Sequence, residues 1–233
     1  MTTETKNSVK VDEVLLEQMA QEGLVFGRRK ARTNPKMKGY IFATRAGFEF
    51  FDLEKTATKL EEAKTFLASV AKTGKPILFV GSTPAAAAAV KATAEKFKAP
   101  FVVHRWLGGT LTNFDTIQTR LKYYLTLKAD KASGRLDKYT KKERTQFDKE
   151  LERLSTLFGG LEGLNSMPGA VVVMNAKAHD IAVKEAVIAG VPVVALVNTD
   201  TNPAGIDYVI PGNDNSVASI GWVMKQLEGA ISK

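Results

Sequence analysis

The sequence of 233 residues contains no cysteine, which excludes disulfide bonds and thiolate metal sites. Its only histidines are His104 and His179, so a zinc site built from several imidazoles is not expected. No hydrophobic run approaches the roughly 20 residues that cross a bilayer. The N-terminus lacks the apolar stretch of a secretory signal, and residues 1–10 are polar and expected to be flexible. These absences favour a cytoplasmic protein without a membrane partner.

Acidic residues are missing from the stretch between positions 28 and 45, here called the basic segment. Like charges repel one another unless an anion neutralises them, and nucleic-acid phosphate is the commonest such partner. A solvated basic loop is the alternative, but a Gly- and Pro-punctuated stretch favours a surface that lies along a polyanion. The candidate contacts are Arg28, Arg29, Lys30, Arg32, Lys36, Lys38 and Arg45, together with Asn34 in the Asn34-Pro35 turn.

Charge is unevenly distributed over a chain of otherwise ordinary composition. Residues 1–157 hold 29 basic and 18 acidic side chains, whereas residues 158–233 hold 4 and 7. The overall net charge is +8, with 44% hydrophobic and 25% charged residues, and the length suffices for a substantial core. A partner-facing basic part and a nearly neutral part are therefore distinct in sequence.

Short runs that are apolar throughout alternate with helical stretches in much of the chain. Such runs are typical of strands buried on both faces, and their alternation with helices predicts a doubly wound α/β domain with a parallel sheet. Upstream, the pattern predicts a helix over 11–22, a β-hairpin whose strands begin at Tyr40 and Phe48, and a helix over 53–73. The predicted buried strands are residues 77–80, 101–103, 170–174, 193–197 and 208–210.

Residues 112–158 contain no strand signal and interrupt this pattern. Apolar side chains recur at intervals of three and four in 112–128 and again in 140–158, which predicts an antiparallel, coiled-coil-like helical hairpin inserted between residues 11–111 and 159–233. Thr140 and Glu143 have the spacing of a capping box. The basic tip could probe a second surface or simply be solvated. Its basic residues are Lys128, Lys131, Arg135, Lys138, Lys141, Lys142 and Arg144.

The evidence for an enzyme is weak, although α/β chains often are enzymes. The turn after Val80, Gly81-Ser-Thr-Pro, lies where phosphates often bind, but neither dinucleotide nor P-loop glycine pattern accompanies it. No Ser-His-acid set is evident. Asp200, Asp207 and Asp214 could hold a cation, yet turn and capping roles explain them more simply. We therefore expect no catalytic residue, metal or cofactor; a nucleotide- or sugar-phosphate-binding enzyme that uses the Gly81 turn is the competing hypothesis.

The loop that begins at His104 combines an imidazole, a guanidinium and an indole at the carboxyl end of a predicted strand. His104, Arg105 and Trp106 suit phosphate contact and stacking on a sugar or base. Trp106 could equally anchor the core. We include all three among the candidate RNA contacts.

Several motifs resemble those of the bacterial family of small-subunit ribosomal protein number two. They occur in the family's order: Phe26-Gly, Asn34-Pro-Lys-Met37, Asp52-Leu-Glu-Lys-Thr56, Arg105-Trp-Leu-Gly-Gly-Thr-Leu-Thr-Asn113, Glu185-Ala, Gly190-Val-Pro-Val and Ile210-Pro-Gly-Asn-Asp214. The resemblance implies a Rossmann-like (flavodoxin-like) sheet with an inserted α-helical hairpin. It further implies no enzymatic activity, binding to 16S ribosomal RNA near the head–body junction, and recruitment of the large first small-subunit protein. Other small-subunit proteins would be partners, and DNA would not.

The chain departs from the family pattern at a few positions. Family members commonly have His where this chain has Arg28, an aromatic where it has Thr33, and Asp where it has Asn175 and Asn198. Roles that depend on those family side chains are not transferred. Besides the ribosomal and enzymatic hypotheses, a protein-interaction adaptor that uses the helical hairpin remains a third possibility.

Overall fold

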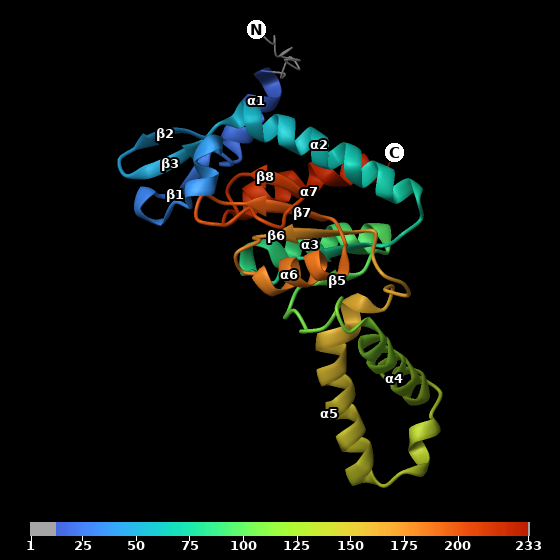
Figure 1. The fold of residues 1–233 in the computed structure, drawn as a ribbon. Coiled ribbons are helices and arrows are strands. Elements are labelled where there is room, and N and C mark those ends of the chain that lie inside the picture. Colours follow the sequence, from blue (N-terminus) through green and yellow to red (C-terminus); the bar gives the residue numbers. More distant parts are fainter. Residues whose placement is uncertain (1–12, 233) are drawn as a thin grey trace.

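The computed structural model describes residues 13–232, so the predicted flexible residues 1–10 lie outside the described part. Its centre is a five-stranded parallel sheet in the order β5-β4-β6-β7-β8, and this confirms the predicted α/β fold (Figure 1). This strand order is that of flavodoxin-like folds. The strands are β4 (Ile77–Val80), β5 (Phe101–Val102), β6 (Ala170–Met174), β7 (Val193–Val197) and β8 (Tyr208–Pro211).

Helices cover both faces of this sheet because its strands are apolar on both sides. One cluster of buried residues joins alternate strand residues such as Phe79 and Val172 to helices α2, α3 and α7. The other cluster joins the intervening strand residues, such as Val80 and Val173, to α6, to the first part of α4 (Phe114–Ala132) and to the end of α5 (Lys141–Phe158). The bounds are α2 Leu53–Lys72, α3 Pro84–Phe97, α6 Asp180–Ala189 and α7 Val217–Ile231.

A small antiparallel sheet precedes this domain, with the order β1-β3-β2. The predicted β-hairpin is confirmed by the pairing of β2 with β3, whose turn places Ala46 and Gly47 at positive φ, as two-residue hairpin turns require. The elements are α1 (Glu13–Gln21), β1 (Phe26–Arg29), η1 (Lys30–Arg32), η2 (Pro35–Tyr40), β2 (Ile41–Arg45) and β3 (Phe48–Phe51).

The basic segment is more ordered than its composition indicated. Besides the predicted hairpin strand, the sequence offered only the Asn34-Pro35 turn, whereas the structure also contains the end of β1 and two short 3₁₀ helices. Met37 explains the difference, because its side chain is completely buried and fastens η2 to the larger cluster. Asn34 caps η2 by accepting a hydrogen bond from the Lys36 N–H.

Two long helices, α4 (Phe114–Ala132) and α5 (Lys141–Phe158), project from the sheet domain and are here called the arm (Figure 1). The 3₁₀ helix η3 (Arg135–Lys138) joins them, and η4 (Gly159–Leu161) follows α5. The predicted capping box is confirmed, since Thr140 and Glu143 bond reciprocally. Seam residues Leu121 and Leu154 are buried near the domain, whereas Phe147 and Leu151, which lie nearer the tip, are only partly buried.

Candidate nucleic-acid interface

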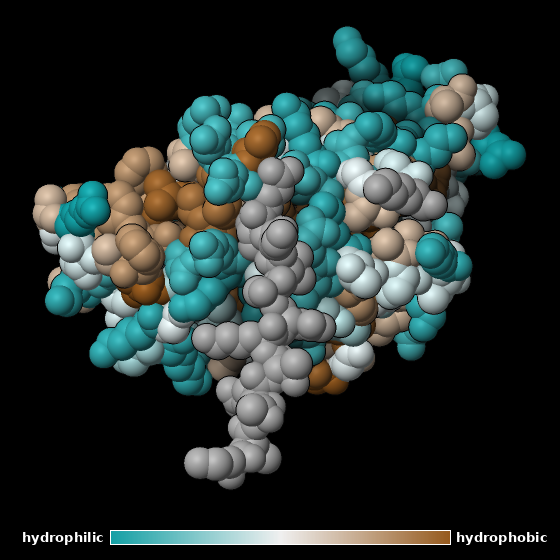
Figure 2. All heavy atoms as spheres, turned by 90° about the horizontal axis from the view of Figure 1, so that it is seen from above, coloured by the Kyte–Doolittle hydropathy of each residue, from teal (hydrophilic) through white to brown (hydrophobic). Residues whose placement is uncertain are grey.

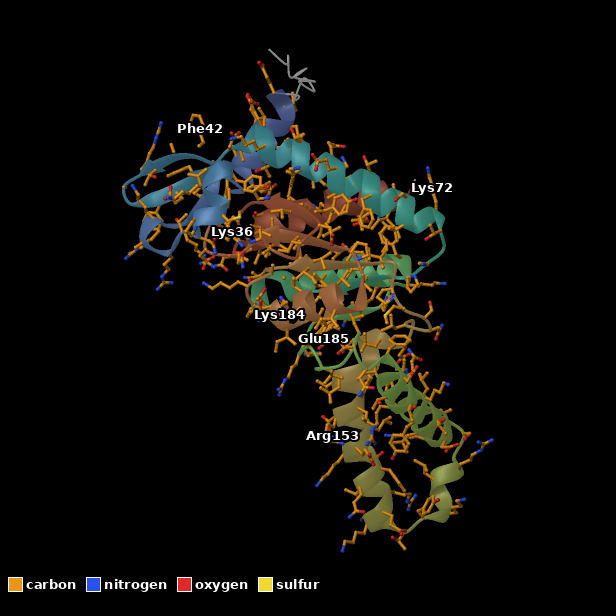
Figure 3. All side chains as sticks on the ribbon, viewed as in Figure 1. Lys36, Phe42, Lys72, Arg153, Lys184 and Glu185 are labelled. Carbon is orange, nitrogen blue, oxygen red and sulfur yellow. The ribbon has the colours of Figure 1, made fainter. Side chains whose placement is uncertain are left out.

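Most cations of the basic segment are exposed, and no ion pair to them is found within residues 13–232. Arg29 lies over the Phe48 ring, with its guanidinium carbon 5.6 Å from the ring centroid. Lys36 projects from the side of the small sheet that adjoins the domain (Figure 3). These side chains form an unneutralised positive surface. They are Arg29, Lys30, Arg32, Lys36, Lys38 and Arg45.

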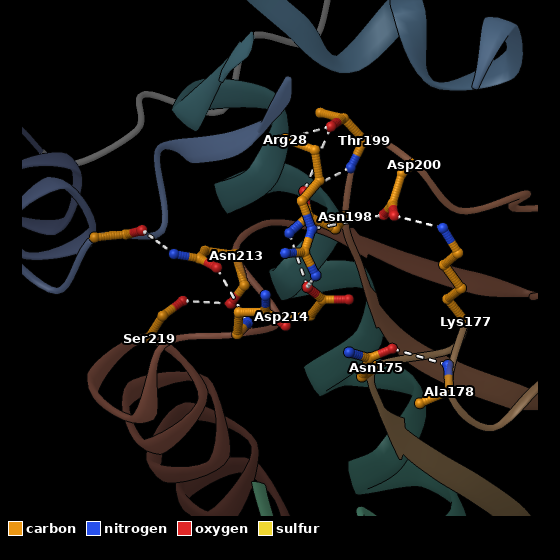
Figure 4. A network of polar contacts seen from close by, with 12 residues as sticks. Arg28, Asn175, Lys177, Ala178, Asn198, Thr199, Asp200, Asn213, Asp214 and Ser219 are labelled. Atoms are coloured by element: carbon orange, nitrogen blue, oxygen red, sulfur yellow. Dashed lines mark hydrogen bonds and ion pairs between the residues drawn. The ribbon is translucent and has the colours of Figure 1, made fainter. Parts of the chain in front are cut away.

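Arg28 differs from its neighbours because its guanidinium turns toward two acids (Figure 4). It lies 3.5 Å from an Asp214 carboxylate oxygen and 3.9 Å from one of Asp200, and its own side chain is 30% exposed. Lys177 supplies the second cation, with its Nζ 2.6 Å from Asp200. Arg28 therefore pairs with acids of the protein itself, although the sequence pattern grouped it with the outward-facing cations.

Backbone contacts fasten the same segment to the carboxyl end of β7. The Arg28 N–H donates to the Thr199 hydroxyl at 2.9 Å, and the Asn34 N–H donates to the Thr199 carbonyl at 2.8 Å. Gly27 is required there, because a Cβ at this position would lie 2.7 Å from the Thr199 methyl group. The exposed cations are thus presented on a backbone whose position is set by the sheet domain.

The Arg28 network fills the sheet edge where α/β proteins usually bind ligands. Asn198 donates to an Asp214 carboxylate oxygen at 2.8 Å, and its own carbonyl accepts from the Thr199 N–H. Burial raises the pKa of the Asp214 carboxyl, and the contacts with Asn198 and Arg28 only partly oppose that effect. The chain's own side chains therefore occupy this edge around Arg28, and a cavity of about 770 Å³ lined by Asn34, Lys177 and Asp200 lies beside them.

The three aspartates considered as a cation site are not brought together. Asp207 accepts from the Val193 N–H, whereas Asp200 and Asp214 face Arg28. Within residues 13–232 no group of three or more His, Asp or Glu side chains is arranged to hold a metal ion. Ion pairing by Asp200 and Asp214 and a backbone contact by Asp207 are the roles that the structure contains; none of the three caps a helix within the described residues.

The turn after β4 is also occupied. The Ser82 N–H donates to His179 Nε2 at 2.9 Å, and His179 Nδ1 donates to the Asn175 carbonyl at 2.9 Å. Burial lowers the pKa of the His179 imidazole. A Cβ at Gly81 would lie 2.7 Å from a Val90 methyl group, so this glycine serves close packing. The turn at Gly81, which was the competing phosphate site, is therefore a tight βα turn filled by the chain's own side chains.

The loop from His104 to Asn113 exposes two of its three candidate contacts. His104 and Arg105 are exposed, whereas Trp106 is half-buried and its indole N–H donates to Glu185 at 3.0 Å. Trp106 therefore anchors the loop. In the sequence, Glu185 stands out only as part of the Glu185-Ala motif, because α6 also carries the charged residues Asp180 and Lys184.

Several cations of the arm are already paired with acids of the arm. Lys131 lies 2.7 Å from Asp148, Arg135 lies 3.0 Å from Asp130, and Arg144 lies 3.4 Å from Asp137. Lys128 lies 2.7 Å from Glu162, just beyond the arm. The other three exposed tip cations have no ion pair within the described residues. They are Lys138, which lies over the Tyr139 ring, and Lys141 and Lys142.

An apolar surface adjoins the basic segment. Phe26, Phe42 and Phe48 are 51%, 75% and 44% exposed, and together they are here called the aromatic face. Figure 2 shows hydrophobic side chains gathered at the end of the molecule formed by β1–β3. Exposed aromatic clusters of this kind mark protein-interaction sites.

No helix in residues 13–232 has the length and apolar character to span a membrane.

Comparison with known proteins identifies the family. The family model described as ribosomal protein S2 matches residues 19–233. The small ribosomal subunit protein uS2 of Dictyoglomus turgidum is 41% identical over 94% of this chain and 89% of its own length. The uS2 of Francisella tularensis subsp. novicida is 41% identical over 93% and 91%, and that of Roseiflexus castenholzii 40% over 93% and 82%. With this fold, these motifs and these relatives, the chain belongs to the ribosomal protein S2 family.

Proposed function

We propose that this chain is a structural constituent of the small ribosomal subunit and binds 16S ribosomal RNA near the head–body junction in the cytoplasm. Its family consists of structural proteins rather than enzymes. The observation that carries the RNA-binding proposal is the row of exposed, unpaired cations on the basic segment, whose backbone is fastened to Thr199. A positioned row of cations suits a phosphate backbone, because little ordering entropy is lost when RNA binds.

The loop and the arm supply two further contact regions. His104 and Arg105 are exposed at the start of the loop, and Lys138, Lys141 and Lys142 are exposed and free of ion pairs at the arm tip. These groups donate to phosphate and recognise RNA shape rather than base sequence. Arg28 and Trp106 contribute by holding the backbone in place, since their polar groups contact Asp214 and Glu185.

The aromatic face supports a second part of the proposal, which is contact with other small-subunit proteins. It provides apolar area next to cations, the composition of a protein interface rather than of a phosphate-binding surface. We assign to this face the recruitment of the large first small-subunit protein. The Gly81 enzyme hypothesis is not carried further, because the family is non-enzymatic.

Gradient sedimentation tests the ribosomal role. Tagged chain should travel with small subunits, and the association should be lost after RNase treatment. Chain that stays in the supernatant, or a complex that resists RNase, contradicts RNA binding and favours a protein adaptor.

Recruitment is tested on the same particles with two matched variants. Phe42→Ser alters the aromatic face, whereas Ile188→Ser alters an equally exposed apolar side chain on α6; the two are 75% and 76% exposed. The content of the large first protein should fall several-fold in particles with Phe42→Ser and remain unchanged with Ile188→Ser. Equal content in both variants contradicts the assignment.

A further inference from the structure

The carboxylate of Glu185 accepts hydrogen bonds from several donors of a single loop that is distant in sequence. Its Oε1 accepts from the Trp106 indole N–H at 3.0 Å and from the Gly109 N–H at 2.8 Å. Its Oε2 accepts from the Leu111 N–H at 3.1 Å and, over longer distances, from the N–H and hydroxyl of Thr112. Glu185 itself is only 7% exposed on α6. A helix of the sheet domain thus holds the loop that connects β5 to the arm.

These hydrogen bonds are needed because the loop has no regular partner for its backbone. Gly109 adopts a φ of +88°, and Leu111 is almost completely buried, at 2% exposure. A buried N–H without an acceptor is costly, so loss of the carboxylate would favour rearrangement of the loop. Burial raises the pKa of Glu185. The hydrogen bonds donated to its carboxylate lower the pKa by more than burial raises it, so the net result is a lowered pKa.

The held loop joins two candidate RNA contacts to the start of the arm. His104 and Arg105 begin it, and α4 starts at Phe114 immediately after it. The chain returns from the arm through Gly160, where a Cβ would lie closer than any real contact to the Phe101 carbonyl oxygen. The returning connection is therefore held by close backbone packing, and the loop of the outgoing connection is supported by Glu185, while α4 itself also bonds to Leu164 and Glu162. Figure 3 places Glu185 on α6, on the side facing the base of the arm.

We propose that Glu185 is a positioning residue that sets both the direction in which the arm leaves the sheet domain and the orientation of His104 and Arg105. The carboxylate acts on the loop, and the loop carries the two candidate RNA contacts and the first turn of α4. The consequence for RNA binding rests on the proposed function; the geometry of the arm does not.

Because the chain has no cysteine, the arm direction can be measured directly with two introduced labels. Spin labels at Lys149→Cys on α5 and Lys225→Cys on α7, both exposed, report the distance from the arm to the domain by pulsed EPR. Glu185→Gln keeps the side-chain size but sets an amide NH₂ against N–H donors. The matched control, Asp180→Asn, makes the same chemical change on the same helix at a 60% exposed side chain paired with Lys184.

We expect a narrow distance distribution for the parent and for Asp180→Asn, and one at least twice as wide, or shifted, for Glu185→Gln. A distribution for Glu185→Gln that matches the parent overturns the proposal. Trp106→Phe covers the case in which Glu185→Gln fails to fold, because it removes one donor and leaves the others. It should broaden the distribution to a smaller degree, and no broadening also overturns the proposal.

The RNA consequence is read from hydroxyl-radical protection of 16S rRNA. With the Glu185→Gln variant, the rRNA nucleotides protected by the loop and the arm should lose their protection. The nucleotides protected by the basic segment should keep it. A broadened arm with every protection retained overturns the link between Glu185 and RNA contact. If the parent protects no RNA, the proposed function fails, while the EPR distances still decide the structural role of Glu185.

Discussion

The basic segment and the arm tip each hold seven cations, but only the tip also holds acids, and the structure treats the two sets of cations differently. In the segment, the one inward-facing cation, Arg28, is paired with buried acids, and the others are exposed and unpaired within residues 13–232. In the tip, three cations are paired with acids of the arm. Exposed pairs are worth about 0–1 kcal/mol, so phosphate can displace those acids at a small cost. A count of basic residues in the sequence therefore overestimates the number of unpaired cations at the tip.

The backbone beneath the two regions differs as well. The segment is joined to the sheet domain by Thr199 and by the buried Met37, whereas the arm's buried seam thins out toward its tip. We infer that the segment presents its cations on a rigid support and that the tip is the less stable surface. The first three predictions each test one part of this contrast, and the fourth concerns the sheet domain alone.

The largest expected effect is on RNA affinity and its dependence on salt. Replacing Lys30, Arg32, Lys36 and Lys38 with Ala should reduce the slope of log K against log salt by about three, at 0.7–0.9 per lost phosphate contact. Replacing Lys138, Lys141 and Lys142 should reduce it by about two. Titrations of a 16S rRNA fragment over a range of salt concentrations measure both slopes.

The control for charge removal is a set of exposed lysines elsewhere on the sheet domain. Replacement of Lys72, Lys75, Lys91 and Lys225 with Ala lowers the net charge equally but should leave the slope unchanged. If this set lowers the slope as much as the segment set does, binding depends on net charge alone, and the contrast between the regions fails.

The second prediction concerns the inward-facing cation. Arg28→Met should lower the free energy of unfolding by about 2 kcal/mol, because Asp214 is then left buried without its cation; the partial exposure of Arg28 keeps the loss below that of a fully buried pair. Denaturant unfolding should show a lower midpoint at an unchanged m value. Asp214→Asn in the Arg28→Met background should restore part of the loss. A midpoint equal to the parent's contradicts the structural role of Arg28.

The third prediction weakens the arm tip alone. Thr140→Ala removes the capping box of α5 and should destabilise its first turn by about 1 kcal/mol. Amide hydrogen exchange should speed up several-fold in residues 141–145 and stay unchanged in β6 and β7. Equal acceleration in the sheet would mean that the tip and the domain unfold as one unit.

The smallest effect concerns pH. The folded-state pKa of His179 is lowered by burial, so the stability that depends on neutral imidazole is complete above the ordinary pKa of 6.5 and is lost as the pH falls below it. Ser82 loses its acceptor when Nε2 is protonated. His179→Asn should flatten the decline in unfolding free energy between pH 7 and 5, whereas His104→Asn, at an exposed site, should not. An unchanged decline in His179→Asn contradicts this assignment.

Local pattern was enough to predict the strands of the sheet domain. β4, β6 and β7 coincide with the predicted runs, and β8 extends the predicted 208–210 by one residue, because residues buried on both faces leave a continuous apolar signature. The helix ends were predicted to within a few residues: the capping box marked α5, whereas α4 begins two residues later and ends four residues later than its pattern suggested. The composition also located the basic segment.

What the sequence could not show is which polar side chains face inward. Arg28 and Lys30 are both cations in one acid-free stretch, and only the packing against β7 and β8 brings Arg28 to Asp214. Likewise, nothing near Glu185 in the sequence indicates that its carboxylate accepts from residues more than 70 positions away. Hydrophobic periodicity is a property of neighbouring residues and is encoded locally. Pairing of buried charges depends on which strand ends meet at one sheet edge, and the tertiary structure alone decides that.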